Sequence, residues 1–495
     1  MTPVRTRLAP SPTGTPHIGT IRQAIFDWLL ARNTGGTFIL RLEDTDQSRF
    51  VPESVEAIYE SLRWLGLDWD EGPEVGGPHA PYVQSQRLPL YQAAAKRLLD
   101  SGKAFECYCT PQRLDAMRNR QRELKQPPGY DGRCRTEEGR AGAKAEAGGR
   151  NPVVRFMTPD EGVTVFHDHV RGDIEVENVR LDDTVLLKSD GFPTYHLAMV
   201  VDDHEMEITH VIRNEEWLPS APIHKLVFDA LGYEMPVMVH TASIVGPDRA
   251  KLSKRHGAQS VLEYRDMGYL PDAVFNFLAL LGWSLDDHTE IISREDFVRH
   301  FTIDRIQKSP GLFNLEKLDW MNAEYIRAMP DRELARYLIG WLERQEPDGG
   351  LPEHVERPLD VEYTASILPL VKERVKRGHD ALNMMGFFYY PGPLPDLDID
   401  VLLGKKYRDD RAQAALLLSE ALVLAESLDD WSAGPMEEAY RALADRLAVK
   451  GGDIFGLMRV AITGRTVSPP LFQSMEVLGR ERSVVRLREA TQTLQ

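Results

Sequence analysis

The sequence is short of cysteine, with three among 495 residues, and it lacks any long apolar run. Three thiols cannot form a disulfide framework, which excludes a small disulfide-stabilised secreted scaffold. No stretch of about 18 apolar residues is present to span a membrane, and the first residues contain no apolar signal-peptide core. We therefore expect a cytoplasmic protein without a membrane partner.

Basic residues are outnumbered, since 59 lysines and arginines face 76 acidic residues for a net charge of −17. This balance argues against a protein that coats nucleic acid through its overall field. Three basic segments remain as candidate contacts, at residues 118–125, 372–377 and 480–488. Each alone is typical of a solvated helix face, but three in one chain modestly favour contact with nucleic acid.

What is present at the start is a strand, a helix and a second strand. Residues 4–11 predict a strand and loop, and residues 36–46 a buried strand that ends in acids. Between them, residues 20–35 predict a helix in which Thr20 and Gln23 fit a capping box and Gly35 can end the helix. Such a crossover implies a parallel sheet, and ligands bind at the carboxyl ends of its strands. The segments "APSPTGTPHIGT" and "LEDTD" lie at those ends.

The alternation of strands and helices is then interrupted and resumes. Residues 1–80 and 190–250 predict two halves of an α/β Rossmann-type domain, and residues 81–189, which contain the cysteines, an inserted module. Residues 251–325 begin with "KLSKR", and residues 326–495 are predicted to be helical.

Two of these segments suit a bound phosphate. In residues 9–20, prolines stiffen the loop, glycines let the backbone approach a ligand, and the following helix N-terminus favours an anion near His17. In residues 251–255, basic side chains suit a loop that holds negative charge. Taken separately, the first is equally a turn with a surface histidine, and the second an ordinary basic loop.

Together the two segments resemble the HIGH and KMSKS signatures of class I aminoacyl-tRNA synthetases. The segments "LRLEDTD", "LGLDWDEGP", "YDGRCR", "LLKSDGFPTYHLAMVVDDH" and "VIRNEEWLPS" extend the resemblance over almost the whole chain, to the bacterial glutamyl-tRNA synthetases. The resemblance implies an α/β Rossmann-type catalytic domain with an inserted α+β acceptor-binding module, a stem-contact region at 251–325 and an all-α anticodon-binding region.

The activity implied is that of a ligase that converts L-glutamate and ATP to glutamyl-adenylate and transfers the glutamyl group to the 3′-terminal adenosine of tRNA(Glu). Such transfer needs positioning and charge stabilisation more than covalent help. The expected partners and cofactors are tRNA(Glu), L-glutamate, ATP and Mg²⁺, and the expected state is a monomer. The alternatives are a small-molecule nucleotidyltransferase, a modifier that glutamylates a tRNA base, and an RNA-binding protein with an inactive site.

The resemblance also assigns roles to residues at the motif positions. The catalytic residues are His17, Lys251 and Lys254. The ATP-binding residues are Pro10, His17, Gly19, Thr20, Lys251, Ser253 and Lys254. The glutamate-binding residues are Arg7, Ser11, Glu43, Tyr195, Arg213 and Trp217. The alternative for Arg7 is an ion pair with the acids of "EDTD", and for the two aromatic residues it is core packing.

The cysteines resemble the zinc knob of some relatives. Structural zinc takes four ligands. Thr136 stands where some zinc-binding relatives have a histidine, but Tyr130 stands where another branch of the superfamily has a tyrosine, so the resemblance implies the ligands Cys107, Cys109, Tyr130 and Cys134. The alternative is three thiols without a metal.

The choice of tRNA is connected with the helical last third. A glutaminyl enzyme would have β-barrels there, and few strand patterns are present. In this family, enzymes that charge tRNA(Glu) alone tend to read the last anticodon base with an arginine, and Arg374 is the best match. Its alternative role is a phosphate contact, and the alternative specificity is a non-discriminating enzyme that also charges tRNA(Gln).

Overall fold

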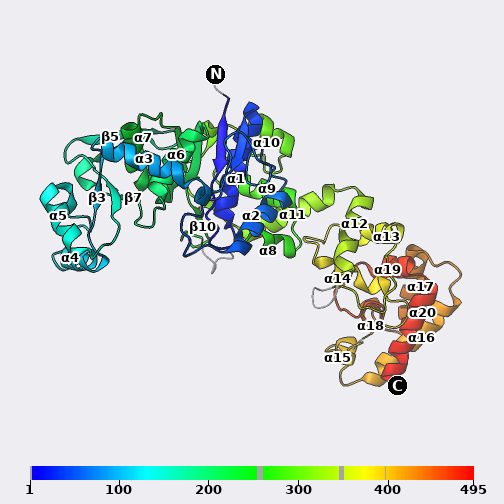
Figure 1. The fold of residues 1–495 in the computed structure, drawn as a ribbon. Coiled ribbons are helices and arrows are strands. Elements are labelled where there is room, and N and C mark those ends of the chain that lie inside the picture. Colours follow the sequence, from blue (N-terminus) through cyan, green and yellow to red (C-terminus); the bar gives the residue numbers. More distant parts are fainter. Residues whose placement is uncertain (1–2, 253–259, 345–349, 396) are drawn as a thin grey trace. The chain divides into compact units, whose positions relative to one another are not determined.

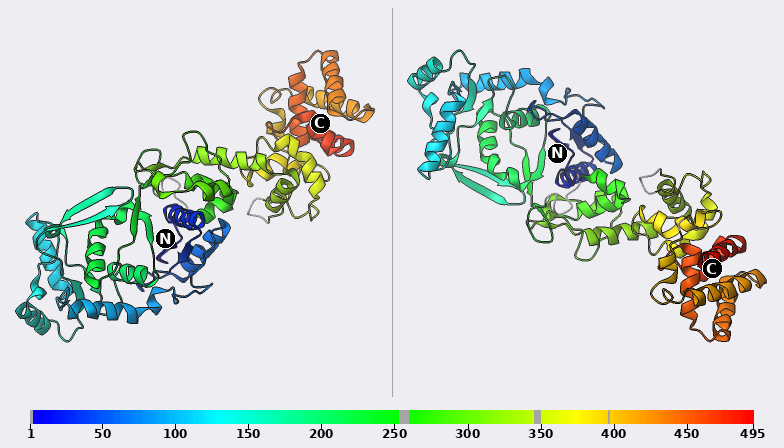
Figure 2. Two further views of the ribbon diagram at one scale, coloured as in Figure 1. Left: turned by 90° about the horizontal axis from the view of Figure 1, so that it is seen from above. Right: turned by 90° about the horizontal axis from the view of Figure 1, so that it is seen from below.

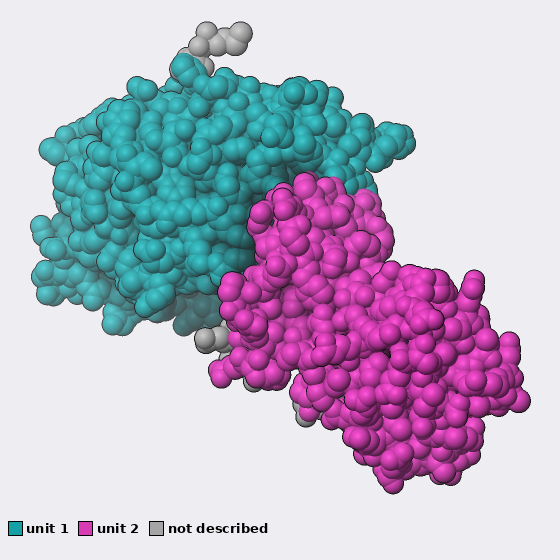
Figure 3. All heavy atoms as spheres, turned by 90° about the vertical axis from the view of Figure 1, so that its right-hand side faces the viewer, with its two compact units in different colours: residues 1–265, 271–315 teal, residues 266–270, 316–495 magenta. Residues whose placement is uncertain are grey.

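A computed structural model describes residues 3–252, 260–344, 350–395 and 397–495 of the chain. It divides into two compact units, residues 1–265 with 271–315 (unit 1) and residues 266–270 with 316–495 (unit 2) (Figure 3). Among the described residues, no helix is both long and apolar enough to cross a membrane.

Unit 1 starts with the expected strand–helix–strand arrangement. β1 (Arg5–Leu8) pairs in parallel with β2 (Thr37–Leu40), and α1 (Ile18–Thr34) connects them (Figure 1). The helix begins two residues earlier than predicted, because His17 is its N-cap and the Thr20 N–H already donates to the His17 carbonyl. The predicted capping box of Thr20 and Gln23 is therefore wrong. Gly35 ends the helix as predicted, in a left-handed conformation.

A second parallel pair follows the inserted module. β8 (His210–Asn214) pairs in parallel with β9 (Val237–Thr241), which is also paired with β5 (Val163–Asp168). The antiparallel partner of β5 is β6 (Gly172–Glu177), so the strand order is β6-β5-β9-β8. Three helices contribute to the buried apolar cluster that includes residues of β8 and β9: α3 (Leu88–Asp100), α6 (Tyr195–Glu205) and α7 (Ala221–Leu231).

The inserted module is a small α+β structure. β3 (Ala104–Cys107), β4 (Val153–Phe156) and β7 (Val185–Leu187) form an antiparallel sheet. Two helices accompany it, α4 (Pro111–Glu123) and α5 (Glu137–Glu146). Phe105, Cys107, Cys134 and Ala143 form a separate small core in this module. The basic residues of segment 118–125 lie at the end of α4 and after it, and they are exposed.

Four further helices and one further strand pair lie between β2 and unit 2. They are α2 (Pro52–Trp64), α8 (Val261–Asp266), α9 (Pro271–Ala279), α10 (Arg294–His300) and the parallel pair β10 (Ile244–Val245) and β11 (Gly311–Leu312). β10 ends at Val245, and after a short turn Lys251 forms an antiparallel bridge back to Val245. The segment "KLSKR" therefore starts from an ordered strand end.

The described residues of unit 2 form helices and loops, without a strand (Figure 2). Its helices are α11 (Leu315–Ala328), α12 (Asp331–Leu342), α13 (Val361–Val371), α14 (Asp380–Met385), α15 (Ile399–Leu403), α16 (Arg411–Ser427), α17 (Ala433–Arg446), α18 (Gly451–Thr463), α19 (Leu471–Leu478) and α20 (Arg480–Leu494). The expected fold class, an α/β domain with an insertion followed by an all-α region, is confirmed. The domain boundaries given above stay a prediction.

One arginine of a basic segment does not lie on the surface that the sequence suggested. Residues 480–488 start α20, but Arg486 is buried and donates to the carbonyls of Ile462, Phe387 and Tyr390 at 2.7–2.9 Å. This arginine satisfies loop and helix-end carbonyls inside unit 2, so it contributes nothing to a basic face.

Candidate active site

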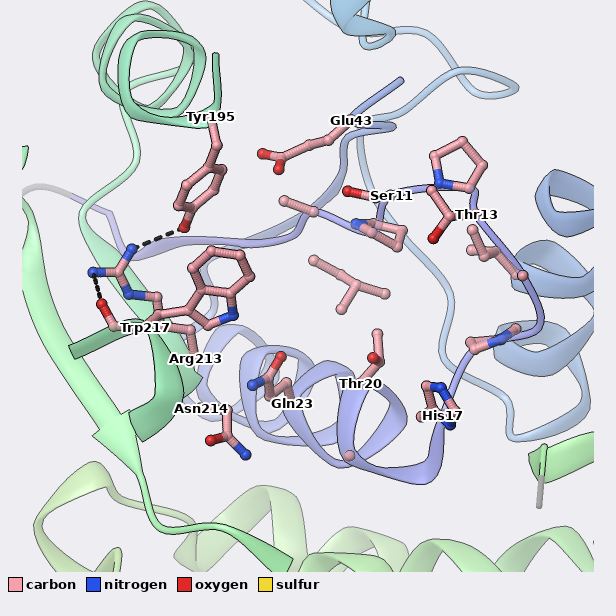
Figure 4. Close-up of a pocket in the computed structure, with 18 of the residues that line it drawn as sticks. Ser11, Thr13, His17, Thr20, Gln23, Glu43, Tyr195, Arg213, Asn214 and Trp217 are labelled. Atoms are coloured by element: carbon pink, nitrogen blue, oxygen red, sulfur yellow. Dashed lines mark hydrogen bonds between the residues drawn. The ribbon is translucent and has the colours of Figure 1, made fainter. Parts of the chain in front are cut away.

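A pocket of about 950 Å³ lies in unit 1, at the carboxyl ends of β1, β2 and β8 and at the start of α1 (Figure 4). Its lining includes the loop of residues 9–20, the acids after β2 and the segment after β10. The predicted residues that line it are Arg7, Pro10, Ser11, His17, Gly19, Thr20, Glu43, Tyr195, Arg213, Trp217 and Lys251. Ser253 and Lys254 lie outside the described residues.

The loop of residues 9–20 is held by backbone hydrogen bonds. Glu43 N–H donates to the Pro10 carbonyl (3.0 Å), and Val51 N–H donates to the Pro12 carbonyl (2.9 Å). A β-carbon at Gly19 would have nothing within 4 Å, so this glycine leaves open space beside the first turn of α1. His17 is exposed at the N-terminus of that helix, whose free N–H groups favour an anion.

Arg213 is a buried cation whose contacts are uncharged. Its guanidinium donates to His240 Nε2 (2.9 Å), to the Tyr195 hydroxyl (2.9 Å) and to the Trp217 carbonyl (3.5 Å). Among the described residues it forms no ion pair, and burial lowers its pKa. Tyr195, Trp217 and Arg213 lie together at one end of the pocket, and His17 lies at the other (Figure 4). A buried guanidinium without a counter-ion is suited to bind a carboxylate of a ligand.

Arg7 has an ion pair, but not with the acids of "EDTD". Its Nε lies 3.1 Å from Asp203 Oδ1, and Asp203 also accepts from Arg41 at 2.7 Å. Burial works against ionisation of Asp203, yet the two arginines hold its pKa below the usual value. Arg41 and Asp203 were not singled out from the sequence, although Asp203 lies in the quoted segment "VVDDH".

Glu43 is buried beside this ion-pair network. Arg41 donates to its Oε1 at 3.1 Å, and the Gln84 amide lies 3.4 Å from the same oxygen. Among the described residues both contacts go to Oε1, which leaves Oε2 available to the pocket. Burial raises the pKa of Glu43, and the Arg41 charge opposes that shift. A ligand ammonium would suit this oxygen.

Asp27 on α1 is a buried acid that the sequence did not single out. Neither carboxylate oxygen has a hydrogen-bond partner among the described residues, and the residue lines the pocket. Burial raises its pKa well above the usual value, although the Arg7 charge opposes the shift. The ionised form of this side chain is therefore unfavourable in the folded protein.

The predicted zinc ligands lie together in the inserted module. The three thiols lie within 4.8 Å of one another, and Cys109 and Cys134 are 3.6 Å apart. The Tyr130 hydroxyl lies 3.5 Å from the sulfurs of both Cys107 and Cys109. Tetrahedral zinc with bonds of about 2.3 Å to sulfur and about 2.0 Å to oxygen would give separations of about 3.8 Å and about 3.5 Å. The four side chains therefore fit the metal.

Arg374 lies in unit 2, just after α13. It is exposed, and its guanidinium donates to the Ser468 carbonyl at 2.9 Å. The hydrogen bond fixes one nitrogen and leaves the rest of the donor fork accessible.

Comparisons with known proteins agree along the chain. A family model described as "tRNA synthetases class I (E and Q), catalytic domain" matches residues 3–320, and one described as "Anticodon binding domain" matches residues 333–491. The glutamate–tRNA ligase of Dehalococcoides mccartyi strain BAV1 is 48% identical over 98% of this chain and 96% of its own length. That of Acidothermus cellulolyticus is 45% identical over 98% of this chain and 95% of its own length.

A solved structure is similar over the same extent. The crystal structure of a glutamate tRNA ligase from Elizabethkingia meningosepticum, in complex with its amino acid, has a TM-score of 0.85 and 34% identity, and the match covers 99% of this chain and 100% of that one.

Proposed function

The chain belongs to the glutamate–tRNA ligases of the class I aminoacyl-tRNA synthetases, and we propose that its pocket joins L-glutamate to the 3′-terminal adenosine of tRNA(Glu). The glutamate α-carboxylate attacks the α-phosphorus of ATP, and pyrophosphate leaves. A ribose hydroxyl of the terminal adenosine then attacks the glutamyl carbonyl, and AMP leaves. The observation that carries this proposal is Arg213, a buried guanidinium at the pocket whose contacts are all uncharged.

Glutamate has two carboxylates and one ammonium, and the pocket has a group for each. Arg213 and the Tyr195 hydroxyl bind the side-chain carboxylate, and Trp217 packs on Tyr195 at 4.6 Å between ring centroids. Glu43 accepts the ammonium through Oε2, with Ser11 beside it. Arg7 faces the α-carboxylate, although Asp203 already takes part of its charge.

ATP lies toward the other end of the pocket. Pro10, Gly19 and Thr20 leave room for the nucleotide, and His17 with the first N–H groups of α1 binds its phosphates. Lys251 stabilises charge on the departing pyrophosphate, after its exposed ion pair with Glu216 opens. Ser253 and Lys254 have the same role by resemblance alone. Class I synthetases use ATP with Mg²⁺, which neutralises phosphate charge.

The inserted module binds one structural zinc ion through Cys107, Cys109, Tyr130 and Cys134. The distances given above support this, as does the Cys134 N–H, which donates to the Tyr130 hydroxyl at 2.9 Å and orients it. The metal would connect the end of β3 to the loop before α5 and stabilise the module.

The protein acts as a monomer in the cytoplasm, and unit 2 reads the anticodon. Exposure of Arg374 supports its role as a reader of the last anticodon base, which favours tRNA(Glu) over tRNA(Gln). The full-length similarity to glutamate–tRNA ligases, helical unit included, favours this activity over a small-molecule nucleotidyltransferase.

Aminoacylation with radiolabelled glutamate tests the proposal, with tRNA(Glu) and tRNA(Gln) charged side by side. We expect charging of tRNA(Glu) and little of tRNA(Gln). Equal charging of both would replace the discriminating specificity by the non-discriminating one. Failure to charge either, by protein that is folded, would overturn the proposed function.

A further inference from the structure

A buried carboxylate and a buried imidazole stand behind Arg213. Asp168 ends β5, His240 lies in β9, and Arg213 lies in β8, so the three residues come from adjacent strands, and the last two are register partners. His240 Nδ1 lies 2.6 Å from Asp168 Oδ2, and Arg213 Nε lies 2.9 Å from His240 Nε2. All three side chains are buried.

This geometry determines where the imidazole carries its proton. Arg213 Nε can only donate, so His240 Nε2 must accept, and the proton of the neutral ring therefore sits on Nδ1 and is donated to Asp168. The carboxylate also accepts from the backbone N–H groups of Val170, Arg171 and His240, at 2.8–3.1 Å. Four donors on one carboxylate keep it ionised, and its pKa is lowered.

A carboxylate in direct contact would orient an arginine equally well. Elsewhere in unit 1, buried arginines are paired directly with carboxylates. Arg87 pairs with Asp202 at 2.7 Å, and Arg41 pairs with Asp203 at 2.7 Å. At Arg213 a neutral ring separates the acid from the guanidinium. The arginine is oriented by a hydrogen bond, but no neighbouring carboxylate competes with a ligand for its charge.

We propose that Asp168 and His240 are positioning residues for glutamate recognition: the carboxylate fixes the imidazole tautomer, and the imidazole fixes the Arg213 guanidinium so that its outer nitrogens face the ligand carboxylate. This proposal rests on the function proposed above for Arg213. Neither residue touches glutamate, so the pair governs the KM for glutamate and leaves the KM for ATP and the kcat at saturating glutamate almost unchanged.

The test begins with Asp168→Asn. The asparagine oxygen still accepts from Val170 and Arg171, but its amide group faces His240 Nδ1 and drives the ring to the Nε2–H tautomer. The Nε2–H of His240 would then face the Nε–H of Arg213, and neither group could accept a hydrogen bond from the other. We expect the KM for glutamate to rise about tenfold or more, with the KM for ATP within about twofold.

The same substitution in a His240→Gln background separates tautomer control from simple structural loss. A glutamine oxygen accepts from Arg213 Nε and has no tautomer to fix, so Asp168→Asn should raise the KM for glutamate by less than about twofold there. Asp183→Asn is the control: Asp183 is buried like Asp168, but its partner is an arginine of the inserted module. It should lower stability without changing that KM.

Two results would overturn the proposal. One is an unchanged KM for glutamate in folded Asp168→Asn, and the other is a penalty of equal size in both backgrounds. Should Asp168→Asn not fold, His240→Leu decides, because it removes the acceptor that His240→Gln keeps: a glutamate KM equal in these two variants rejects the pair. Arg213→Ala shows whether the positioning role or the proposed function of Arg213 itself has failed. If it raises the KM and the pair does not, the positioning role alone falls; if it leaves the KM unchanged, the proposed function of Arg213 falls.

Discussion

Arginines that the sequence does not distinguish have different partners in the structure. Arg486 was part of a supposed basic face, yet it is buried and bonded to carbonyls. Arg7 is ion-paired with Asp203, and Arg213 has uncharged partners. A motif gives the position of an arginine, but the atoms around its guanidinium decide whether its charge remains available.

Replacing Arg213 by alanine tests whether its uncompensated charge binds glutamate. The substitution removes the cation that we assign to the side-chain carboxylate of glutamate. We expect the KM for glutamate to rise at least about a hundredfold, or about 3 kcal/mol, with the KM for ATP little changed. The measurement is ATP–pyrophosphate exchange in the presence of tRNA. Arg97→Ala, which removes an arginine bonded to the Leu231 carbonyl away from the pocket, should leave both constants unchanged.

Asp27 gives a prediction about stability. Its folded-state pKa is raised, so below the ordinary value of 3.8 both states are protonated, and as the pH rises above it the unfolded chain ionises while the folded one resists. The acid therefore destabilises the fold at neutral pH. Asp27→Asn should raise the free energy of unfolding by about 1–2 kcal/mol at pH 7, and by less at pH 4.

Thermal denaturation at the two pH values measures this effect. Asp203→Asn is the control, because that aspartate is equally buried but ion-paired with Arg7 and Arg41, so its replacement should lower stability. A loss of stability in Asp27→Asn at pH 7 would contradict the prediction.

At the scale of elements, the order and type of the helices and strands were predicted better than the residues at which they begin and end. The crossover of β1, α1 and β2 follows from apolar periodicity, and the turn of residues 9–20 at the carboxyl end of β1 follows from it. The start of α1 was misplaced because Thr20 is a good capping residue, whereas the chain uses His17 without a side-chain cap. The contact of Asp168 and His240 with Arg213 could not be predicted, because the three residues are brought together only by the pairing of β5, β9 and β8.

The proposed zinc site of the inserted module has its own test. Purified protein should contain about one zinc per chain by elemental analysis, and Tyr130→Phe should lower zinc retention during dialysis against a chelator by about tenfold or more. Tyr108→Phe is the matched control, since its hydroxyl donates to Glu106 rather than to a thiol. Zinc-free wild-type protein, purified without chelators, would leave the thiols as a small apolar core alone.

At the scale of the molecule, acid stability depends on histidines that are buried or half-buried and whose pKa values are lowered. Burial lowers the pKa of His196, His224 and His240, with the Arg213 charge acting in the same direction on each. As the pH falls below 6.5, the unfolded chain binds protons at these rings more readily than the folded chain does. Stability therefore falls as the pH decreases, by at most about 1.4 kcal/mol per pH unit for each ring.

Urea unfolding of the full chain between pH 7.5 and 5 measures this loss. His196 is half-buried, so His196→Gln should fold and should reduce the pH slope by the share of one ring. His288→Gln, an exposed histidine, should leave the slope unchanged. An identical slope in His196→Gln and wild type would contradict the prediction.

The uncharged surroundings of Arg213 also bear on the rejection of glutamine. The outer nitrogens of the guanidinium carry N–H groups alone, and a carboxylate offers them two acceptors. A carboxamide offers one acceptor and one further donor, so free glutamine would set a donor against a donor in a buried place. Such an unpaired group costs about 1–3 kcal/mol, or about ten- to a hundredfold in affinity. With the role that we propose for Arg213, amino-acid selection at this end of the pocket would depend on hydrogen-bond polarity rather than on size.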